Sequence, residues 1–231
     1  MLRVGLTGGL GSGKSVVAAY LHSQGAEVIQ ADEMGRVLME PGQAVYEEIV
    51  RQFGNEITHR DGSLNRARLA ELAFQGNRLQ ALNAIVHPAV IAAQRQWMEV
   101  VFDINPRAVA VVESALIFEV ERDARKRGEM ETVLADWRQR FDRILVVTAP
   151  YELKISRHVA RSCAKGMGRE EAEADARARM EHQIPDAEKA SHADYVIDNS
   201  GDMDGLRAQA KDVWRRIKGE NDLFAADELV E

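Results

Sequence analysis

Short apolar runs alternate along the chain with longer stretches in which apolar residues recur at helical spacing. A short run that is apolar at nearly every position is typical of a parallel strand covered on both faces. Five such runs are predicted as strands: residues 2–7, 27–29, 108–112, 143–148 and 195–197. Strands that alternate with helices join through right-handed crossovers into one sheet. The pattern therefore predicts an α/β fold in which helices flank a parallel five-stranded sheet.

Three of the longer stretches have clear helical periodicity. We predict helices over residues 14–23, 79–102 and 203–217, with Pro88 marking a break or a helix start in the second. The segment 35–103 is too long for a single crossover helix. It therefore predicts a helical insertion that binds substrate.

The segment 119–140 is dense in charged residues, and opposite charges stand at the i,i+4 spacing that pairs side chains on one helix face. The predicted pairs are Glu121 with Arg125, Asp123 with Arg127, and Asp136 with Arg140. This pattern favours a solvated helix. The acidic segment 219–231 is predicted to form a flexible tail.

Composition narrows the class of protein further. The chain has 231 residues, of which 45% are hydrophobic and 29% charged, as in ordinary soluble proteins. The net charge of −7 argues against a dedicated nucleic-acid binder, although local positive charge can still attract a small anion.

The beginning of the chain and its cysteine content predict a compartment. Glycines and Lys14 interrupt the first apolar run, which is unlike a signal peptide, and no run approaches the ~18 apolar residues of a spanning helix. The only cysteine, Cys163, cannot form an intramolecular disulfide, which fits a reducing compartment. We expect a cytoplasmic protein with no membrane or nucleic-acid partner, and the sequence leaves the oligomeric state open.

The sequence GGLGSGKS at residues 8–15 matches the phosphate-loop pattern G-x-x-x-x-G-K-[ST] in full. Its glycines let successive backbone N–H groups face a phosphate, and the following helix adds its positive N-terminus. In such loops the lysine, here Lys14, bridges the β- and γ-phosphates, and the hydroxyl of Ser15 is placed to bind Mg²⁺. A glycine-rich turn that ends in Lys-Ser by chance fits poorly, because a strand precedes the motif and a helix follows. We therefore predict a P-loop NTPase fold.

The remaining sequence indicates which kind of P-loop protein this is. The guanine-binding pattern Asn-Lys-x-Asp of GTPases is absent, and the match of residues 32–35 to D-x-x-G is too loose to be informative. ATPases of the motor or transporter type are usually larger or carry additional signatures. A small domain with a helical insertion and a late arginine-rich stretch favours a kinase that phosphorylates a small molecule.

Three charged residues are candidates for the chemistry. Asp32 follows the second predicted strand, and ligands of open α/β sheets bind beyond the carboxyl ends of the strands. It can therefore orient a hydroxyl or accept its proton, and the alternative is that it caps a helix. Arg157 and Arg161 share one helix face, where they either form part of a lid that stabilises a transferring phosphoryl group or form an exposed basic face.

In order and spacing, the chain resembles dephospho-coenzyme A kinase from Leu6 to about Leu206. The matching segments are LTGGLGSGKS (6–15), AD (31–32), EPG (40–42), LNR (64–66), VHP (86–88), LIFE (116–119), RHVAR (157–161), QIPDAEK (183–189) and ADYVIDNSG (193–201). The resemblance implies transfer of the γ-phosphate of ATP, with Mg²⁺, to the 3′-hydroxyl of the dephospho-coenzyme A ribose. This reaction is the last step of coenzyme A biosynthesis. A kinase for nucleoside monophosphates or shikimate, or a nucleotide-binding regulator without transfer activity, remain alternatives.

The resemblance also implies a domain layout and site residues. It implies one kinase domain over residues 1–218, with the substrate-binding insertion at 35–103 and a lid at 151–185. The hydroxyl-facing carboxylate is Asp32, and Arg66 and His87 lie on the substrate side, unless Arg66 is only a surface charge and His87 only ends or caps a helix. The implied ATP-binding residues of the loop are Gly11, Ser12, Gly13, Lys14, Ser15 and Val16, and Ser15 is also the implied Mg²⁺ ligand. Asn199 and Gly201 are implied to lie near the adenine. The implied lid arginines are Arg157 and Arg161.

The chain departs from this resemblance in four places. Gln30 stands where many relatives have Asp, so that a shared carboxylate pair is reduced to Asp32 alone. Val16 replaces the usual Thr. Glu113 begins a Glu-Ser-Ala sequence in place of Asp-x-Pro, and it either reaches the metal through water or packs at the strand end. The charged segment 119–140 is also longer than in relatives.

Overall fold

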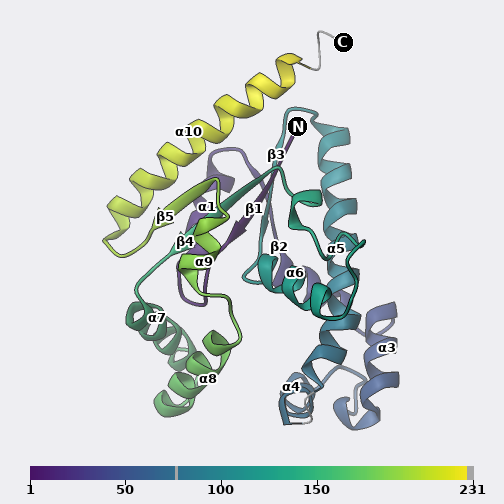
Figure 1. Cartoon of the computed structure of the whole chain (residues 1–231). Helices are drawn as coiled ribbons and strands as arrows, with labels where there is room; N and C mark the ends of the chain where they lie inside the picture. The colour runs from purple at the N-terminus through teal and green to yellow at the C-terminus, as the bar shows by residue number, and fades with distance from the viewer. Residues whose placement is uncertain (76–77, 228–231) are drawn as a thin grey trace.

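The computed structural model describes residues 1–75 and 78–227. Its five strands form one parallel sheet of order β2-β3-β1-β4-β5 (Figure 1). The predicted fold class is confirmed. The first and fourth strands have the predicted bounds, and the other three end one residue later than predicted. The strands are β1 (Leu2–Thr7), β2 (Glu27–Gln30), β3 (Val109–Glu113), β4 (Arg143–Thr148) and β5 (Tyr195–Asp198).

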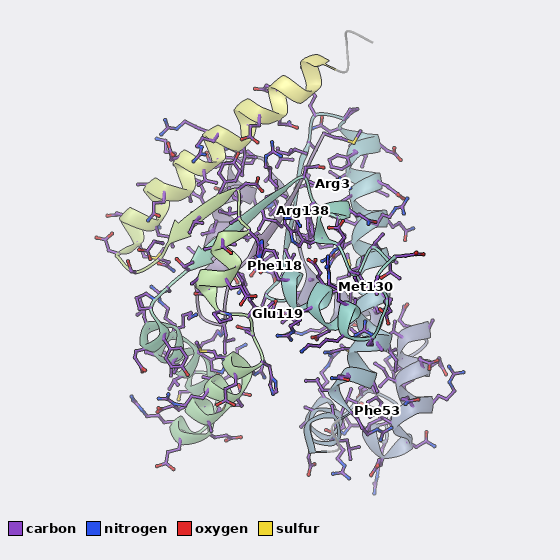
Figure 2. The ribbon with its side chains drawn as sticks, in the orientation of Figure 1. Arg3, Phe53, Phe118, Glu119, Met130 and Arg138 are labelled. Carbon is purple, nitrogen blue, oxygen red and sulfur yellow. The ribbon has the colours of Figure 1, made fainter. Side chains whose placement is uncertain are left out.

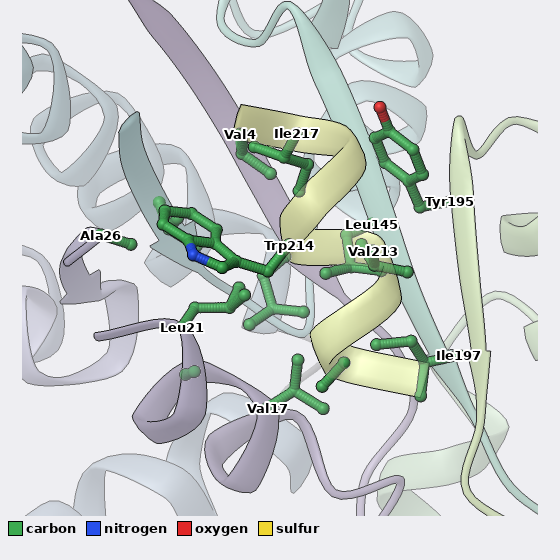
Figure 3. Close-up of a cluster of buried hydrophobic side chains, with 14 of the residues drawn as sticks. Val4, Val17, Leu21, Ala26, Leu145, Tyr195, Ile197, Val213, Trp214 and Ile217 are labelled. Carbon is green, nitrogen blue, oxygen red and sulfur yellow. The ribbon is translucent and has the colours of Figure 1, made fainter. Parts of the chain in front are cut away.

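Helices α1 (Lys14–Ser23) and α10 (Met203–Asp227) cover one face of this sheet. Figure 3 shows Trp214 and Ile217 of α10 packed between Leu21 of α1 and the strand residues. Because the apolar residues of β1, β3 and β4 are buried on both sides, these strands read as continuous apolar runs in the sequence.

The other face carries α5 (Leu79–Ile104), α6 (Ile117–Lys126) and α9 (Asp186–Ser191). A single α5 runs through Pro88, so the predicted break or helix start at this residue is wrong. The missing N–H of Pro88 removes one helical hydrogen bond. Val86 and Val90, on either side of it, pack into the same buried cluster, which holds the two halves of the helix in line.

The predicted insertion, residues 35–103, contains the second half of α2 (Ala31–Leu38), α3 (Ala44–Phe53), a 3₁₀ turn η1 (Asn55–Ile57), α4 (Arg66–Gln75) and nearly all of α5. It has an apolar cluster of its own around Ile49, Ile57 and Leu69. In Figure 1, α3 and α4 lie below the sheet on one side. Helices α7 (Tyr151–Cys163) and α8 (Arg169–Glu181) lie below it on the other side and pack together through Ile155 and Ala176.

The charged segment is folded differently from the predicted solvated helix. Helix α6 ends at Lys126, Gly128 adopts a positive φ of 80°, and a short 3₁₀ turn η2 (Trp137–Gln139) precedes β4. Of the three predicted pairs, only Glu121 with Arg125 forms. Arg127 pairs with Glu129 instead, and Arg140 donates to the Ile117 carbonyl. The prediction failed because Gly128 ends the helix and because buried apolar residues follow it: Leu134, Ala135 and Trp137.

Helix α10 is longer than predicted and continues to Asp227. The Glu220 carboxylate accepts a hydrogen bond from Arg143 Nε at 2.8 Å, and buried Asn221 donates to the Arg107 carbonyl. Residues 219–227 are thus helical, and the end of the predicted tail, 228–231, lies outside the described residues. Over the described ranges, no helix combines the length and the apolar content needed to cross a membrane.

Candidate active site

The phosphate loop joins β1 to α1 and needs glycine for two reasons. Gly8, Gly11 and Gly13 have φ values of 149°, 74° and 98°, which other residues rarely adopt. A Cβ atom would also stand 2.3 Å from the Lys154 carbonyl oxygen at Gly11 and 2.1 Å from Asn199 Nδ2 at Gly13. The glycines of the motif therefore set both the curvature of the loop and its close contact with two distant segments.

Lys14 lies at the start of α1, and its ammonium group points back into the loop. Its Nζ donates to the carbonyl oxygens of Gly8 and Gly9, at 3.0 Å each. Burial lowers the pKa of Lys14 to about 8, although the nearby charges of Glu113 and Asp32 act to raise it. Two carbonyl oxygens are weak partners for a buried cation, so an anionic ligand in the loop would hold Lys14 in its charged form.

Ser15 and Glu113 form an oxygen pair at the edge of the same loop. Ser15 Oγ donates to Glu113 Oε1 at 2.9 Å. Glu113 ends β3 and is buried, and its Oε2 has no hydrogen-bond partner in the part of the chain that the structure describes. Hydroxyl and carboxylate oxygens suit Mg²⁺, which usually takes only one or two protein ligands together with water and phosphate oxygens. The pair fits such a site, and the contact with Ser15 favours the metal-side role of Glu113 over simple packing.

Asp32 is the second residue of α2, directly after β2. The capping position of this helix is occupied by Gln30, so Asp32 is not its N-cap. Asp32 lines a cavity of about 180 Å³ together with Lys14, Ser15 and Glu113. The structure thus brings the carboxylate and the phosphate loop to one cavity at the carboxyl edge of the sheet.

The two arginines of α7 reach different places. Arg161 is exposed and lines the cavity of the phosphate loop, and its Nη2 donates to His158 Nδ1 at 3.3 Å. Arg157 Nη2 donates instead to the carbonyl oxygen of Asn199 at 3.2 Å and to its Oδ1 at 3.3 Å. Of these two arginines, Arg161 alone lines the phosphate-loop cavity that contains Asp32.

Asn199 holds the phosphate loop from the end of β5. Its side chain is buried, and Nδ2 donates to the carbonyl oxygen of Ser12 at 2.7 Å. Ser12 is fully buried, whereas Val16 and Gly201 are exposed. Asn199 therefore supports the phosphate loop directly. The resemblance implied a place near the adenine for Asn199 and did not imply this contact.

Arg66 and His87 line a second cavity of about 290 Å³, which also contains Asp32. Arg66 is exposed, and its Nη2 donates to the Arg36 carbonyl at 3.3 Å. His87 lies inside the continuous α5, so it neither ends nor caps a helix. Burial, together with the charges of Arg127 and Arg140, lowers the pKa of His87 to about 4, and its ring is neutral at physiological pH.

Comparison with known proteins identifies the family. The family model described as dephospho-CoA kinase matches residues 2–205 of this chain. The chain belongs to the dephospho-CoA kinase family.

Curated relatives are named dephospho-CoA kinase, and two solved structures match the fold of this chain. The dephospho-CoA kinase of Corynebacterium diphtheriae is 39% identical, over 93% of this chain and 96% of its own length. That of Corynebacterium glutamicum is 38% identical over 94% and 100%. The crystal structure of a Thermus thermophilus protein matches with a TM-score of 0.69 and 33% identity over 93% of this chain and 97% of its own. Dephospho-CoA kinase from Campylobacter jejuni shares the fold, with a TM-score of 0.64 and 22% identity over 95% and 98%.

The structure also shows contacts at and beside the phosphate loop of this chain that the sequence did not predict. Gln183 Oε1 accepts a hydrogen bond from the Leu10 backbone N–H at 2.9 Å. Lys154 of α7 forms an ion pair of 2.8 Å with Asp186 of α9, and both side chains are largely buried. Gln183 and Asp186 fall within the QIPDAEK segment that carries the resemblance, and that segment was the only available signal for them.

A second buried ion pair fixes α9 to α6 in this member of the dephospho-CoA kinase family. Lys189 Nζ lies 2.7 Å from Glu119 Oε1 and donates to the Ala115 carbonyl at 2.8 Å. The same Glu119 oxygen accepts a hydrogen bond from the Ile184 N–H. The two side chains are 0% and 3% exposed. Figure 2 labels Glu119 and the neighbouring Phe118 near the centre of the view. The pair thus joins α9, and through Ile184 the chain that follows α8, to α6.

We expect Lys189→Met to lower the free energy of unfolding by about 3–5 kcal/mol, because it leaves the Glu119 carboxylate buried without its cation. Chemical denaturation followed by circular dichroism would measure the loss. The matched control is the double variant Glu119→Gln/Lys189→Met, which removes both charges and should recover part of the stability. A single variant as stable as the wild type would show that the pair contributes nothing.

Proposed function

We propose that this protein is an ATP-dependent kinase that phosphorylates the 3′-hydroxyl of the dephospho-coenzyme A ribose to give coenzyme A. The observation that supports phosphoryl transfer is the single cavity shared by Lys14, Ser15, Glu113 and Asp32. The family supports the choice of acceptor. No finding favours a shikimate or nucleoside monophosphate acceptor, or a regulator without activity.

The phosphate-loop residues bind the donor in this proposal. Residues 11–16 wrap the phosphates of ATP, and Asn199 and Gly201 follow β5 on the nucleotide side. Lys14 exchanges its two carbonyl contacts for β- and γ-phosphate oxygens. Ser15 and Glu113 are the residues that would hold Mg²⁺, which neutralises charge on the phosphates when bound.

Asp32 acts on the acceptor. Its carboxylate accepts a hydrogen bond from the 3′-hydroxyl and takes the proton as the oxygen attacks the γ-phosphorus, and the bond to the β-phosphate oxygen breaks to release ADP. Arg161, from the same cavity, stabilises charge on the transferring group, and Arg157 acts with it from the Asn199 side. Arg66 and His87 bind more distant parts of the acceptor.

The proposal includes a domain layout and a place of action. Residues 1–218 act as one kinase domain, 35–103 bind the acceptor, and 151–185 form a lid. The partners are small molecules, and we place the reaction in the cytoplasm.

The test incubates purified protein with ATP, Mg²⁺ and dephospho-coenzyme A and identifies the products by mass. We expect coenzyme A together with ADP, and far less of both products with the Lys14→Ala variant. Shikimate and nucleoside monophosphates, offered at the same concentration, should not compete. An unconverted dephospho-coenzyme A would refute the proposal, and tight ATP binding without turnover on any acceptor would indicate a regulator.

A further inference from the structure

The charged segment brings a buried arginine to the wall of the second cavity, which is the acceptor cavity of the proposed function. Arg140 follows η2 and directly precedes the return of the chain to β4. It is only 7% exposed, yet it lines the cavity of about 290 Å³ that contains Asp32 and His87. The sequence predicted this residue to lie on a solvated helix face, and the proposed function gives it no role.

The hydrogen-bonding capacity of Arg140 is only partly used. Its Nη2 donates to the Ile117 carbonyl at 2.9 Å, whereas Nε has no partner within residues 1–75 and 78–227. Glu121 and Asp136 act on it only through longer-range charge, since neither forms an ion pair with it in the described structure. Burial lowers the pKa of Arg140 to about 10, so it keeps its charge at physiological pH. A buried cation without a carboxylate partner is costly, and an anionic ligand would offset that cost.

The cavities fix where such a ligand would lie. Asp32 and Ser114 line both the phosphate-loop cavity and the acceptor cavity. Ile91, Gln94 and Arg140 line both the acceptor cavity and a larger one of about 750 Å³. That third cavity lies between the second half of α5 and the starts of β1 and β4. Asp32 therefore stands at one end of the acceptor cavity, and Arg140 stands at the other.

The proposed acceptor matches this order of groups. With its ribose hydroxyl at Asp32, the next group along the molecule is a diphosphate, followed by a long arm of amide and methylene groups. We propose that Arg140 binds the acceptor diphosphate and thereby selects acceptors that carry it, an inference that rests on the proposed function. His87 supports the same group, because its Nδ1 is a second buried nitrogen on this cavity without a partner in the described part. Beyond Arg140, apolar Met98 and Phe102 of the third cavity suit the arm.

The test compares Arg140→Met with Arg138→Met, which removes an equal charge two residues away on the surface. Arg138 lies over the Trp137 ring and is labelled in Figure 2. We expect Arg140→Met to raise the KM for dephospho-coenzyme A about tenfold or more, as expected for a lost charge-assisted hydrogen bond. The KM for ATP and kcat should remain unchanged. Arg138→Met should leave all three values as in the wild type, and Arg140→Lys, which keeps the charge, should give an intermediate KM.

A second acceptor separates ligand binding from a structural role. Adenosine has the ribose hydroxyl but no diphosphate, so its kcat/KM should be the same in the wild type and in Arg140→Met. An equal loss with adenosine and dephospho-coenzyme A would show that Arg140 only supports the fold and would overturn the inference. An unchanged KM for dephospho-coenzyme A would overturn it as well. Failure of the proposed function is distinct, because the wild-type protein itself would then leave dephospho-coenzyme A unconverted.

Discussion

Asp32→Asn is expected to reduce kcat with dephospho-coenzyme A by about 10²–10⁴-fold, the usual contribution of a positioned general base. The amide is nearly the same size as the carboxylate and can still hydrogen-bond the hydroxyl, but it cannot take up the proton. Gln30 supplies no second carboxylate at the end of β2. ATP binding should change little, because the phosphate loop and the Ser15–Glu113 pair are untouched. Steady-state kinetics and ATP titration would measure the two effects separately.

The matched control for this prediction is Glu33→Gln. Glu33 lies next to Asp32 on α2, but its carboxylate pairs with Arg36 on the same helix. The control removes an equal charge from the same turn and should cause a far smaller loss of kcat. If Asp32→Asn kept near-normal turnover, or if both variants lost the same activity, Asp32 would not be the base.

The strand and phosphate-loop predictions succeeded because their signals are local. The runs at residues 2–7 and 143–148 are apolar at nearly every position, and burial on both faces of the sheet requires this. The glycines of residues 8–15 are equally local, since positive φ angles and close backbone contacts exclude other side chains there. The position of Asp32 followed from the general rule that ligands meet the carboxyl ends of parallel strands.

The contacts that hold the loop were not predictable, because they join segments far apart in the sequence. Asn199 reaches the carbonyl of Ser12 across 187 positions, and Gln183 reaches the Leu10 N–H across 173. Nothing in the local pattern of either segment indicates its partner. Such pairs depend on how β5 and the end of the α7–α8 segment return to the sheet, which is a property of the whole fold.

The charged segment shows how a local pattern can mislead. Its i,i+4 charges indicated a helix, but such pairs contribute only about 0.2–0.5 kcal/mol each. Burial of a single large apolar side chain contributes about 1.5–3 kcal/mol, so Leu134 and Trp137 decide the path of the chain. That path carries Arg140 inward. The same error in the sequence interpretation therefore concealed both the fold of the segment and a candidate acceptor-binding residue.

Lys14→Ala is expected to reduce kcat by at least about 10²–10³-fold, comparable with the loss of one preorganised charge at the reacting group. Lys14 is a buried cation of the phosphate loop. Its interaction with the γ-phosphate is strongest in the transition state, while that group is being transferred. Kinetics at saturating ATP would separate this loss from weaker binding. Near-normal turnover would show that Arg161 or another cation supplies the charge instead.

The pH dependence provides a separate test of Lys14. Because burial lowers its pKa to about 8, the free protein loses the ammonium proton as pH rises through that value. The value of kcat/KM for ATP, which reports the free enzyme, should therefore fall above about pH 8. Bound phosphates favour the charged amine, so kcat should persist to higher pH than kcat/KM. Lys14→Arg, which stays charged throughout, should lack the fall in kcat/KM, and a wild-type profile that is flat to pH 10 would contradict this assignment.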